Sequence, residues 1–364
     1  MKKTIIFIPS IEDGGVEKNL FVISNFLKKK GLPIEILTCN HNMKKKFIKG
    51  IHFIGTKNKF WFNKNRFIKY SVCLFILFLN LFSRKEKLTV FAFQANIYAI
   101  FVTKIFNAKI ITRSNSAPAG WSKNIIKSSV YKFLIKSADD VMVNSLDFKR
   151  SFEKKFKTKV KCIYNPFDKT FINNKIKSKI NLQFFKKNYF NIVSVGRLTD
   201  QKDQLIILKS IQLLKKDFKV RLVIIGKGKN KKLLQNFISR YKLQDKIKLL
   251  GYLKNPYPYI HNSDAVILTS KFEGLPNILL EAQYLKKYII STDCPTGPSE
   301  ILLNGKAGDL IKIGDFRKLT HLIINYKNRK KIIIDKINAG SKKFYRFDYH
   351  TNCMKYLNFI KYNQ

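Results

Sequence analysis

Two carboxylates in one segment, Glu273 and Glu281, are the strongest candidates for chemistry in this sequence, with seven residues between them. Pro276 between them suits the first turn of a helix that begins at this point. Glu273 then precedes a helix start whose backbone N–H groups can bind a phosphate, and a carboxylate beside a phosphate can bind sugar hydroxyls. The structural alternative is a glutamate that favours the helix dipole and an ordinary glutamate on the exposed side.

A pair of cations follows the first strand that we expect in the second half of the chain. Arg197 and Lys202 are five residues apart, come after Gly196, and lead into a helix. Two cations beside a helix N-terminus can clamp a diphosphate. Lysine is abundant in this chain and arginine is scarce, so Arg197 is the more informative of the two. The alternative is a solvated surface loop.

Two glycine pairs follow other predicted strands, Gly14 with Gly15 and Gly226 with Gly228. Glycine allows close approach of backbone or ligand, but each pair is equally compatible with a tight strand-to-helix turn. Neither pair forms G-x-G-x-x-G, and the second strand does not end in an acidic residue, which argues against a dinucleotide enzyme. The second pair also lacks the Lys-Ser or Lys-Thr of a phosphate-binding P-loop.

Several other chemistries lack their signatures. The sequence contains no H-E-x-x-H, no D-x-D and no G-x-S-x-G, and none of its five histidines lies between positions 53 and 260. Its five cysteines are scattered without a C-x-x-C pair, which favours a reducing compartment. Cys294 has no histidine near it in sequence, and we interpret it as a small buried residue rather than a nucleophile.

Short apolar strands alternate with helical segments in both halves of the chain. This pattern predicts parallel, doubly wound sheets, and its interruption after position 165 marks a boundary. We expect an α/β fold of two tandem Rossmann-like domains that face a central cleft. The predicted limits are an N-terminal acceptor-binding domain at 1–168, a linker at 169–189, a C-terminal donor-binding domain at 190–340, and a tail helix at 341–364 that crosses back.

The charge balance is strongly basic, with 71 Lys and Arg against 23 Asp and Glu, a formal net charge of +48. Enrichment of Lys, Ile, Asn and Phe together also indicates a compositional bias, so part of this charge carries no function. A cationic surface attracts anionic lipid or nucleic acid, but scarce arginine argues against base recognition. We therefore favour a membrane surface and expect no nucleic-acid partner.

An aromatic and apolar stretch in the first half could meet that membrane. The run at 70–82 has thirteen residues, flanked by Lys69 and Arg84, and is too short to span a bilayer. It is either a helix packed on the sheet or an interfacial helix. Phe60, Trp61 and Phe62 precede it and could contribute to docking at the bilayer.

Taken together, these segments resemble glycosyltransferase family 4, the retaining transferases of the GT-B fold. The resemblance lies in their order and spacing, extends over nearly the whole chain, and is most specific between 191 and 308. The segments that carry it are Gly14-Gly15, 194–202, 223–228, 273–281 and 291–302.

The resemblance implies a hexosyltransferase with a nucleotide-diphosphate sugar as donor and no metal cofactor. Arg197 and Lys202 would hold the diphosphate and take up the leaving-group charge, Glu273 would bind donor sugar hydroxyls, and these three form the catalytic set. Glu281 would bind the ribose. The implied donor-binding set comprises Gly15, Gly196, Arg197, Lys202, Glu273, Gly274, Leu275, Pro276, Asn277 and Glu281.

The sequence departs from the family at one place. Many relatives carry a histidine near the end of the fourth strand of the first domain, close to the reacting centre. Here the corresponding residues are Arg113, Ser114 and Asn115. We take these three as acceptor-side candidates and assign no general base.

The resemblance and the basic, aromatic first domain lead to one expected function. It is transfer of a hexose or N-acetylhexosamine, preferably from a UDP-sugar, to a lipid-linked glycan in bacterial surface polysaccharide synthesis. The enzyme would be cytoplasmic and peripherally associated with the inner face of the membrane. The alternatives are a soluble family 4 transferase with a free-sugar acceptor, or a non-catalytic basic scaffold or nucleic-acid-binding protein.

Overall fold

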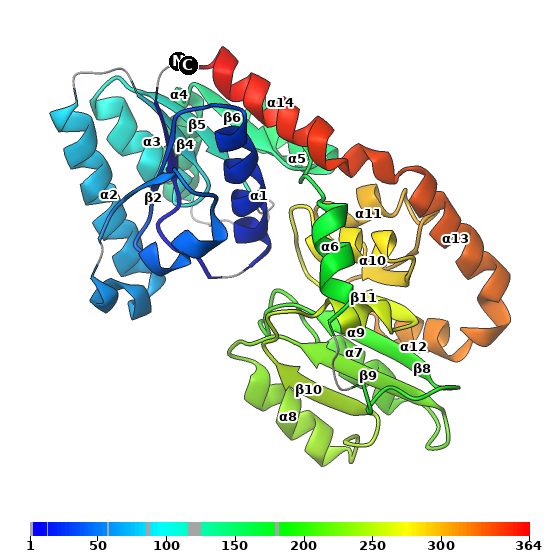
Figure 1. The fold of residues 1–364 in the computed structure, drawn as a ribbon. Coiled ribbons are helices and arrows are strands. Elements are labelled where there is room, and N and C mark those ends of the chain that lie inside the picture. Colours follow the sequence, from blue (N-terminus) through cyan, green and yellow to red (C-terminus); the bar gives the residue numbers. More distant parts are fainter. Residues whose placement is uncertain (1–2, 13, 57, 85–87, 116–124, 179–181) are drawn as a thin grey trace. The chain divides into compact units, whose positions relative to one another are not determined.

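The computed structural model of the chain describes residues 3–12, 14–56, 58–84, 88–115, 125–178 and 182–364. Two compact units are present (Figure 1). Unit 1 comprises Met1–Pro166 together with Phe347–Gln364, and unit 2 comprises Phe167–Arg346. Each unit has its own parallel sheet, so the predicted α/β class with two doubly wound sheets is confirmed.

Unit 1 is built on a seven-stranded parallel sheet in the order β3-β2-β1-β4-β5-β6-β7. Its central strands are buried along their whole length, as expected when helices cover both faces. The strands are β1 (Thr4–Phe7), β2 (Ile34–Leu37), β3 (His52–Ile54), β4 (Thr89–Ala92), β5 (Lys109–Arg113), β6 (Asp140–Val143) and β7 (Lys161–Cys162).

The helices of unit 1 divide between the two faces of this sheet. Ile6 packs with α1 (Gly15–Lys29) and α14 (Tyr349–Tyr362). Its neighbour Ile5 packs with α2 (Arg66–Ser83) and α3 (Asn96–Ile105) on the other face, because successive strand side chains point in opposite directions. The remaining helices are α4 (Ile125–Ser137), α5 (Leu146–Phe156) and the short 3-10 segments His41–Lys46 and Lys59–Asn63.

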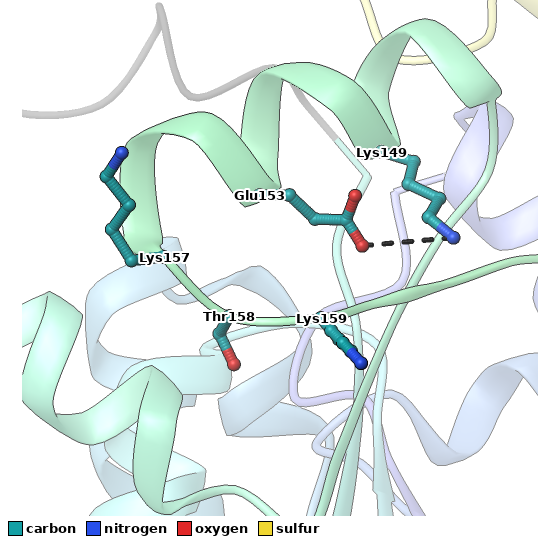
Figure 2. A pocket seen from close by; sticks show the side chains of 5 residues that line it. All are labelled: Lys149, Glu153, Lys157, Thr158 and Lys159. Atoms are coloured by element: carbon teal, nitrogen blue, oxygen red, sulfur yellow. Dashed lines mark ion pairs between the residues drawn. The ribbon is translucent and has the colours of Figure 1, made fainter.

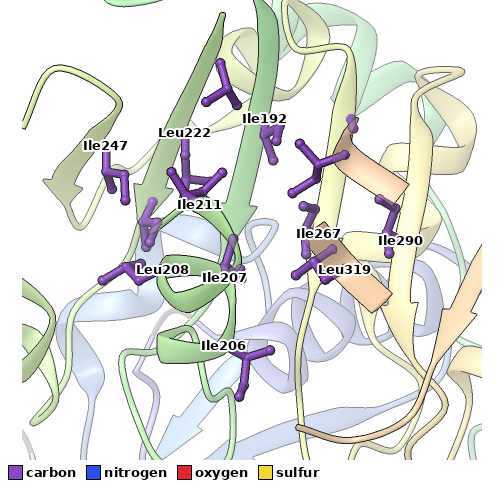
Figure 3. Packing of buried hydrophobic residues seen from close by; sticks show 14 of the residues in the cluster. Ile192, Ile206, Ile207, Leu208, Ile211, Leu222, Ile247, Ile267, Ile290 and Leu319 are labelled. Atoms are coloured by element: carbon purple, nitrogen blue, oxygen red, sulfur yellow. The ribbon is translucent and has the colours of Figure 1, made fainter. Parts of the chain in front are cut away.

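Unit 2 contains a six-stranded parallel sheet in the order β10-β9-β8-β11-β12-β13. Figure 3 shows part of its core, where isoleucine and leucine side chains of the strands meet those of α7 and α12. The strands are β8 (Phe190–Val195), β9 (Val220–Ile225), β10 (Ile247–Gly251), β11 (Ala265–Leu268), β12 (Tyr288–Thr292) and β13 (Asp309–Ile311). The helices are α6 (Lys169–Ile176), α7 (Leu205–Gln212), α8 (Lys231–Arg240), α9 (Tyr257–His261), α10 (Asn277–Tyr284), α11 (Pro298–Ile301), α12 (Phe316–Ile324) and α13 (Lys330–Lys342).

The segment predicted as a linker, 169–189, differs from the expectation. It begins with helix α6, which contacts α9 and therefore belongs to unit 2, and residues 179–181 of it lie outside the described part of the chain. Tyr284 donates a hydrogen bond to Asn173 Oδ1 at 2.8 Å, and Asn255 donates one to the Lys175 carbonyl at 2.9 Å. The boundary between the units therefore falls after Pro166.

The predicted tail helix at 341–364 is also divided differently. Helix α13 ends at Lys342, a 3-10 turn covers Phe344–Phe347, and α14 begins at Tyr349. Asp348 caps this new helix by accepting a hydrogen bond from the Thr351 amide at 2.8 Å. The chain therefore rejoins unit 1 at Phe347 rather than at 341.

Helix α2 (Arg66–Ser83) agrees with the helix expected at 65–82 and contains the apolar run at 70–82. By length and composition alone, α2 could cross a membrane, with 18 residues and a mean hydropathy of 1.5. It is the one helix among the described residues that meets this criterion. One stripe of it, Cys73, Leu77 and Leu81, is nevertheless buried against the sheet. The prediction of a helix packed on the sheet is therefore confirmed for this stripe.

Arg113 anchors the C-terminal helix to unit 1. Its guanidinium is fully buried and donates to the Tyr356 hydroxyl at 2.9 Å and to Asn165 Oδ1 at 2.6 Å, and it also donates to Asn115. The Tyr356 hydroxyl in turn donates to the Ile163 carbonyl at 3.3 Å. A buried cation requires such a complete set of acceptors, so the structure gives Arg113 an architectural role in place of the predicted acceptor contact.

The Tyr356→Phe substitution tests this anchor. It leaves a buried guanidinium N–H without an acceptor, which is expected to lower the free energy of unfolding by about 1–3 kcal/mol in urea denaturation. Tyr362→Phe is the matched control, because Tyr362 lies on the same helix and is 88% exposed. Equal unfolding free energies for both variants would contradict the assigned role of Arg113.

Candidate functional site

The strand order of unit 2 reverses between β8 and β11. From β8 the chain proceeds to β9 and β10 on one side, and then returns to place β11, β12 and β13 on the other side. In open parallel sheets, ligands bind beyond the carboxyl ends of the strands at such a reversal. The loops that follow β8 and β11 are therefore the natural place for a site in this unit.

Lys202 and Glu273 meet at this reversal. Lys202 comes from the loop after β8 and forms an ion pair with Glu273 from the loop after β11. Their side chains are only 15% and 9% exposed, and Ser270 donates a second hydrogen bond to the same carboxylate oxygen at 2.5 Å. The structure thus brings together a cation and a carboxylate that lie far apart in sequence.

Hydrogen bonds between the two loops fix the position of this pair. The Thr269 hydroxyl donates to the backbone carbonyls of Lys202 and Asp203, at 3.1 and 2.9 Å. The Gln201 side chain donates to the Phe272 carbonyl at 2.9 Å. Because these contacts bind backbone to the neighbouring loop, Lys202 and Glu273 are held in place independently of any ligand.

The loop after β12 supports Glu273 from the other side. The Glu273 amide donates to the Pro295 carbonyl at 2.7 Å, and the Thr296 amide donates back to the Glu273 carbonyl at 3.2 Å. The Thr292 hydroxyl donates to the Ser270 carbonyl at 2.6 Å. Three loops from the neighbouring strands β8, β11 and β12 therefore form one hydrogen-bonded layer at the carboxyl edge of the sheet.

Gly226 and Gly228 shape the loop that carries Arg197 and Lys202. A Cβ atom added to Gly226 would lie 1.8 Å from the Gly196 carbonyl oxygen, and one added to Gly228 would lie 2.2 Å from that of Leu198. These glycines are required because two backbone segments pass in contact. This favours the strand-to-helix turn among the alternatives for this pair.

Arg197 differs from Lys202 in its surroundings. Its side chain is exposed, and its guanidinium donates to Gln201 Oε1 at 3.3 Å. The Gln204 side chain fixes the backbone at this point by donating to the Arg197 carbonyl at 3.0 Å. Arg197 is thus a solvent-facing cation on a well-held backbone, able to turn toward an anion.

The second carboxylate, Glu281, lies inside α10 and is only 4% exposed. The Tyr257 hydroxyl donates to it at 3.3 Å. This burial excludes the alternative of an ordinary exposed glutamate, because a buried carboxylate needs polar partners. Pro276 precedes the first helical residue Asn277, and the buried segment Gly274–Pro276 leads into the helix start.

Cys294 lies in the loop after β12 and is only 3% exposed. Burial, reinforced by the nearby negative charge of Glu273, raises the pKa of this thiol to about 12. The group is therefore protonated at neutral pH, which confirms the interpretation of a small buried residue. Across the described ranges, no cluster of three or more His, Cys, Asp or Glu side chains could hold a metal ion.

The glycine loop of unit 1 lies at the carboxyl edge of its own sheet, and two residues missed in the sequence hold it there. Gln94 accepts from the Ser10 amide at 3.2 Å, and Asn40 accepts from the Ile11 amide at 3.1 Å. Gln94 also donates to Glu17 at 3.2 Å, whose pKa is raised by burial. Gln94 and Asn40 each lie two or three residues after a buried strand, β4 and β2 respectively. A polar side chain at the carboxyl end of a buried strand is the sequence signal that could have identified them.

Gly15 is the first residue of α1, directly after the loop that Gln94 and Asn40 hold. Ser114 and Asn115 follow β5 at the same edge of the sheet of unit 1. Ser114 is buried, and Asn115 is half-buried and donates to the Phe93 carbonyl at 2.8 Å. For these two residues the acceptor-side assignment stays a prediction, whereas Arg113 is committed to the C-terminal helix.

A shallow basic pocket lies elsewhere in unit 1 (Figure 2). Its lining residues are Lys149, Glu153, Lys157, Thr158 and Lys159. Lys149 and Glu153 lie on α5, and Lys157, Thr158 and Lys159 lie in the segment between α5 and β7. Lys149 and Glu153 form an ion pair at 3.8 Å. The pocket therefore contains none of the predicted site residues.

The Gly226→Ala substitution tests the close packing behind the site. The added methyl group would overlap the Gly196 carbonyl, and we expect a loss of about 1–3 kcal/mol or more in thermal or urea unfolding. Gly196→Ala is the control in the same loop, because its Cβ would lie 3.6 Å from the nearest Lys202 carbons. Wild-type stability of the Gly226 variant would refute the packing argument.

Comparison with known proteins connects this geometry to an enzyme class. Residues 175–338, within unit 2, match the family model described as glycosyl transferases group 1. An uncharacterised glycosyltransferase of Methanocaldococcus jannaschii is 33% identical over 220 residues, a match that spans 57% of this chain and 54% of that protein.

A full-length relative and a solved structure extend the comparison. The relative is the N-acetylgalactosamine-N,N'-diacetylbacillosaminyl-diphospho-undecaprenol 4-alpha-N-acetylgalactosaminyltransferase of Campylobacter jejuni, 27% identical over 98% of this chain and 100% of its own length. The crystal structure of HepE from Anabaena with UDP-glucose has a TM-score of 0.81 and 18% identity, and covers 99% of this chain and 100% of that chain. The chain thus has the two Rossmann-like units of the GT-B fold, and the match of residues 175–338 to glycosyl transferases group 1, together with the glycosyltransferase relatives, supports a transferase enzyme.

Proposed function

We propose that the chain is a retaining transferase of family 4 that moves a hexose or N-acetylhexosamine from a UDP-sugar to a lipid-linked glycan. The product would be part of a bacterial surface polysaccharide. The observation that carries this proposal is the meeting of Lys202 and Glu273 at the strand reversal of unit 2. UDP-glucose in HepE and the diphospho-undecaprenol in the name of the Campylobacter relative support the choice of donor and acceptor.

The donor would bind across the loops after β8 and β11. Lys202 and Arg197 would hold the diphosphate, aided by the backbone at the start of α10. One oxygen of Glu273 accepts from Lys202 and Ser270, and its second oxygen would accept from hydroxyls of the donor sugar. Glu281, buried in α10, would bind the ribose of the nucleotide.

The transfer step can be written from these groups. The bond between the anomeric carbon and the UDP oxygen breaks, and the leaving diphosphate gains negative charge. Lys202 and Arg197 stabilise this charge, so the step needs no metal ion. The acceptor oxygen attacks from the face that UDP leaves, and its proton passes to the departing phosphate oxygen. The anomeric configuration is thereby retained.

The acceptor side of the proposal places the enzyme at the cytoplasmic face of the membrane as a peripheral protein. A lipid-linked saccharide is held in a bilayer by its lipid, so its enzyme must work at the bilayer surface. The formal net charge of +48 favours an anionic membrane surface. Ser114 and Asn115, at the carboxyl end of β5, are the acceptor-side candidates, and no nucleic-acid partner is proposed.

Single substitutions at the donor site test the assigned roles. Glu273→Gln and Arg197→Ala are each expected to lower kcat by about 100- to 1000-fold, because each removes an interaction with the donor in the transition state. Sugar transfer from a radiolabelled UDP-sugar to a lipid-linked acceptor is the measurement. Arg240→Ala, which removes an exposed arginine of α8, is the control and is expected to keep full activity. Full activity of both donor-site variants would refute the assignment.

Nucleotide binding tests the donor class separately from turnover. UDP at about 100 times its dissociation constant is expected to stabilise the chain by about 2.7 kcal/mol, and the effect is expected to persist in EDTA. The measurement is thermal unfolding with UDP, GDP, ADP or CMP. Stabilisation by GDP alone would overturn the UDP assignment, and loss of the UDP effect in EDTA would overturn metal independence.

A further inference from the structure

An exposed apolar face covers the outer side of unit 1, where α2, α3 and α4 lie. Seven large apolar side chains on these helices are between 53% and 78% exposed, which is more than the single exposed apolar residues of an ordinary protein surface. They are Phe67, Phe75 and Phe82 of α2, Tyr98, Phe101 and Ile105 of α3, and Phe133 of α4. We refer to these seven residues as the outer apolar face.

Helix α2 carries two apolar stripes on opposite sides. Cys73 and Leu77 face the sheet and are fully buried. Phe75, two positions from each of them, is rotated by about 200° around the helix and is 62% exposed. Phe67 and Phe82 continue this outer stripe at 78% and 74% exposure. A helix of a water-exposed surface normally places polar residues there, so the outer stripe needs another explanation.

The neighbouring helices extend the stripe into a broad face. Helix α3 contacts both α2 and α4, and Figure 1 shows α2 and α3 on the side of the unit 1 sheet away from α1. Tyr98, Phe101 and Ile105 recur every three to four residues, which aligns them along one side of α3. Phe133 of α4 is 72% exposed. The face thus spans three adjoining helices.

The charged residues within the three helices of the face are all basic. The sequences of α2, α3 and α4 contain no aspartate or glutamate. Their basic residues include Arg66 at the start of α2, Lys104 in α3, and Lys132 and Lys136 in α4. Of these, Lys104 pairs with Asp139 just beyond α4. Aromatic side chains beside lysines, on helices whose own sequences contain no acidic residue, match the interface of a bilayer that contains anionic lipid.

We propose that the outer apolar face inserts into the surface of an anionic lipid bilayer, with α2 lying in the membrane plane. Its inner stripe remains packed on the sheet, so α2 enters only with its outer side. A second copy of this chain fits less well, because a two-fold contact through this face would place lysines against lysines. The inference deepens the proposed function, on which it rests for the lipid-linked acceptor.

The triple variant Phe67→Gln, Phe75→Gln and Phe82→Gln tests the face. The probe is sedimentation with vesicles of phosphatidylcholine containing phosphatidylglycerol, compared with phosphatidylcholine alone. We expect the variant to bind the anionic vesicles at least about tenfold more weakly than the wild type, since apolar contact contributes to interfacial binding. The matched control changes three exposed isoleucines of unit 2, Ile324, Ile332 and Ile334, to Gln and is expected to bind normally.

The basic residues are tested by the double variant Lys132→Gln and Lys136→Gln. Each lysine near an anionic surface is worth about fivefold in binding, so the pair is expected to weaken binding about 25-fold at low salt. Binding of the double variant to pure phosphatidylcholine vesicles is expected to match that of the wild type. Undiminished binding of both this variant and the triple variant to anionic vesicles would overturn the proposal.

Two further readouts separate this inference from its rivals. Wild-type dimers that become monomers in the triple variant, with no vesicle binding by either, would show a self-association surface and overturn the proposal. Transfer to a short-chain, water-soluble acceptor analogue is expected to be the same in wild type and triple variant. Absence of transfer in both, with vesicle binding lost only in the variant, would refute the proposed function and leave the membrane face intact.

Discussion

The pairing of β8 with β11 is the constraint on which the donor-side geometry depends. Both strands are parallel, so the loops at their carboxyl ends emerge at the same edge, and Lys202 meets Glu273 there. An ion pair withdrawn from water is favourable only when further hydrogen bonds satisfy it. Ser270 supplies one, and the backbone contacts of Thr269 hold both loops in register. The pair is therefore formed without any ligand.

The two cations of the candidate site, Lys202 and Arg197, differ in burial and in how firmly their side chains are held. Lys202 is held beside a carboxylate, so a diphosphate bound as proposed would share it with Glu273 or displace that carboxylate. Arg197 is exposed and only weakly restrained, so it can reorient at little energetic cost. A held residue and an adjustable one suit the proposed donor site, which would both position a sugar and stabilise charge as the diphosphate leaves. The glycines that allow close backbone packing keep this arrangement rigid.

The predictions succeeded where the pattern is local and failed where the partner is distant. Alternation of apolar strands with helices predicted the two sheets, and Pro276 correctly marked the start of a helix. Arg113 follows a strand end and was assigned to the acceptor, yet its guanidinium binds Tyr356, 243 residues further along the chain. The predicted linker at 169–189 differs from the structure for a similar reason, because α6 packs against α9 from a distant part of the chain.

The sequence by itself determined which residues are apolar at each helical or strand period, and therefore the elements, the fold class and the segments that carry carboxylates and cations. Only the tertiary structure decided which of these groups meet. Strand order placed Lys202 against Glu273, and packing assigned Gly226 to a backbone contact. The packing of unit 1 leaves the outer apolar stripe of α2 exposed to solvent. Periodicity specifies that a side is apolar, but it does not specify what covers that side, because the covering element comes from elsewhere in the chain.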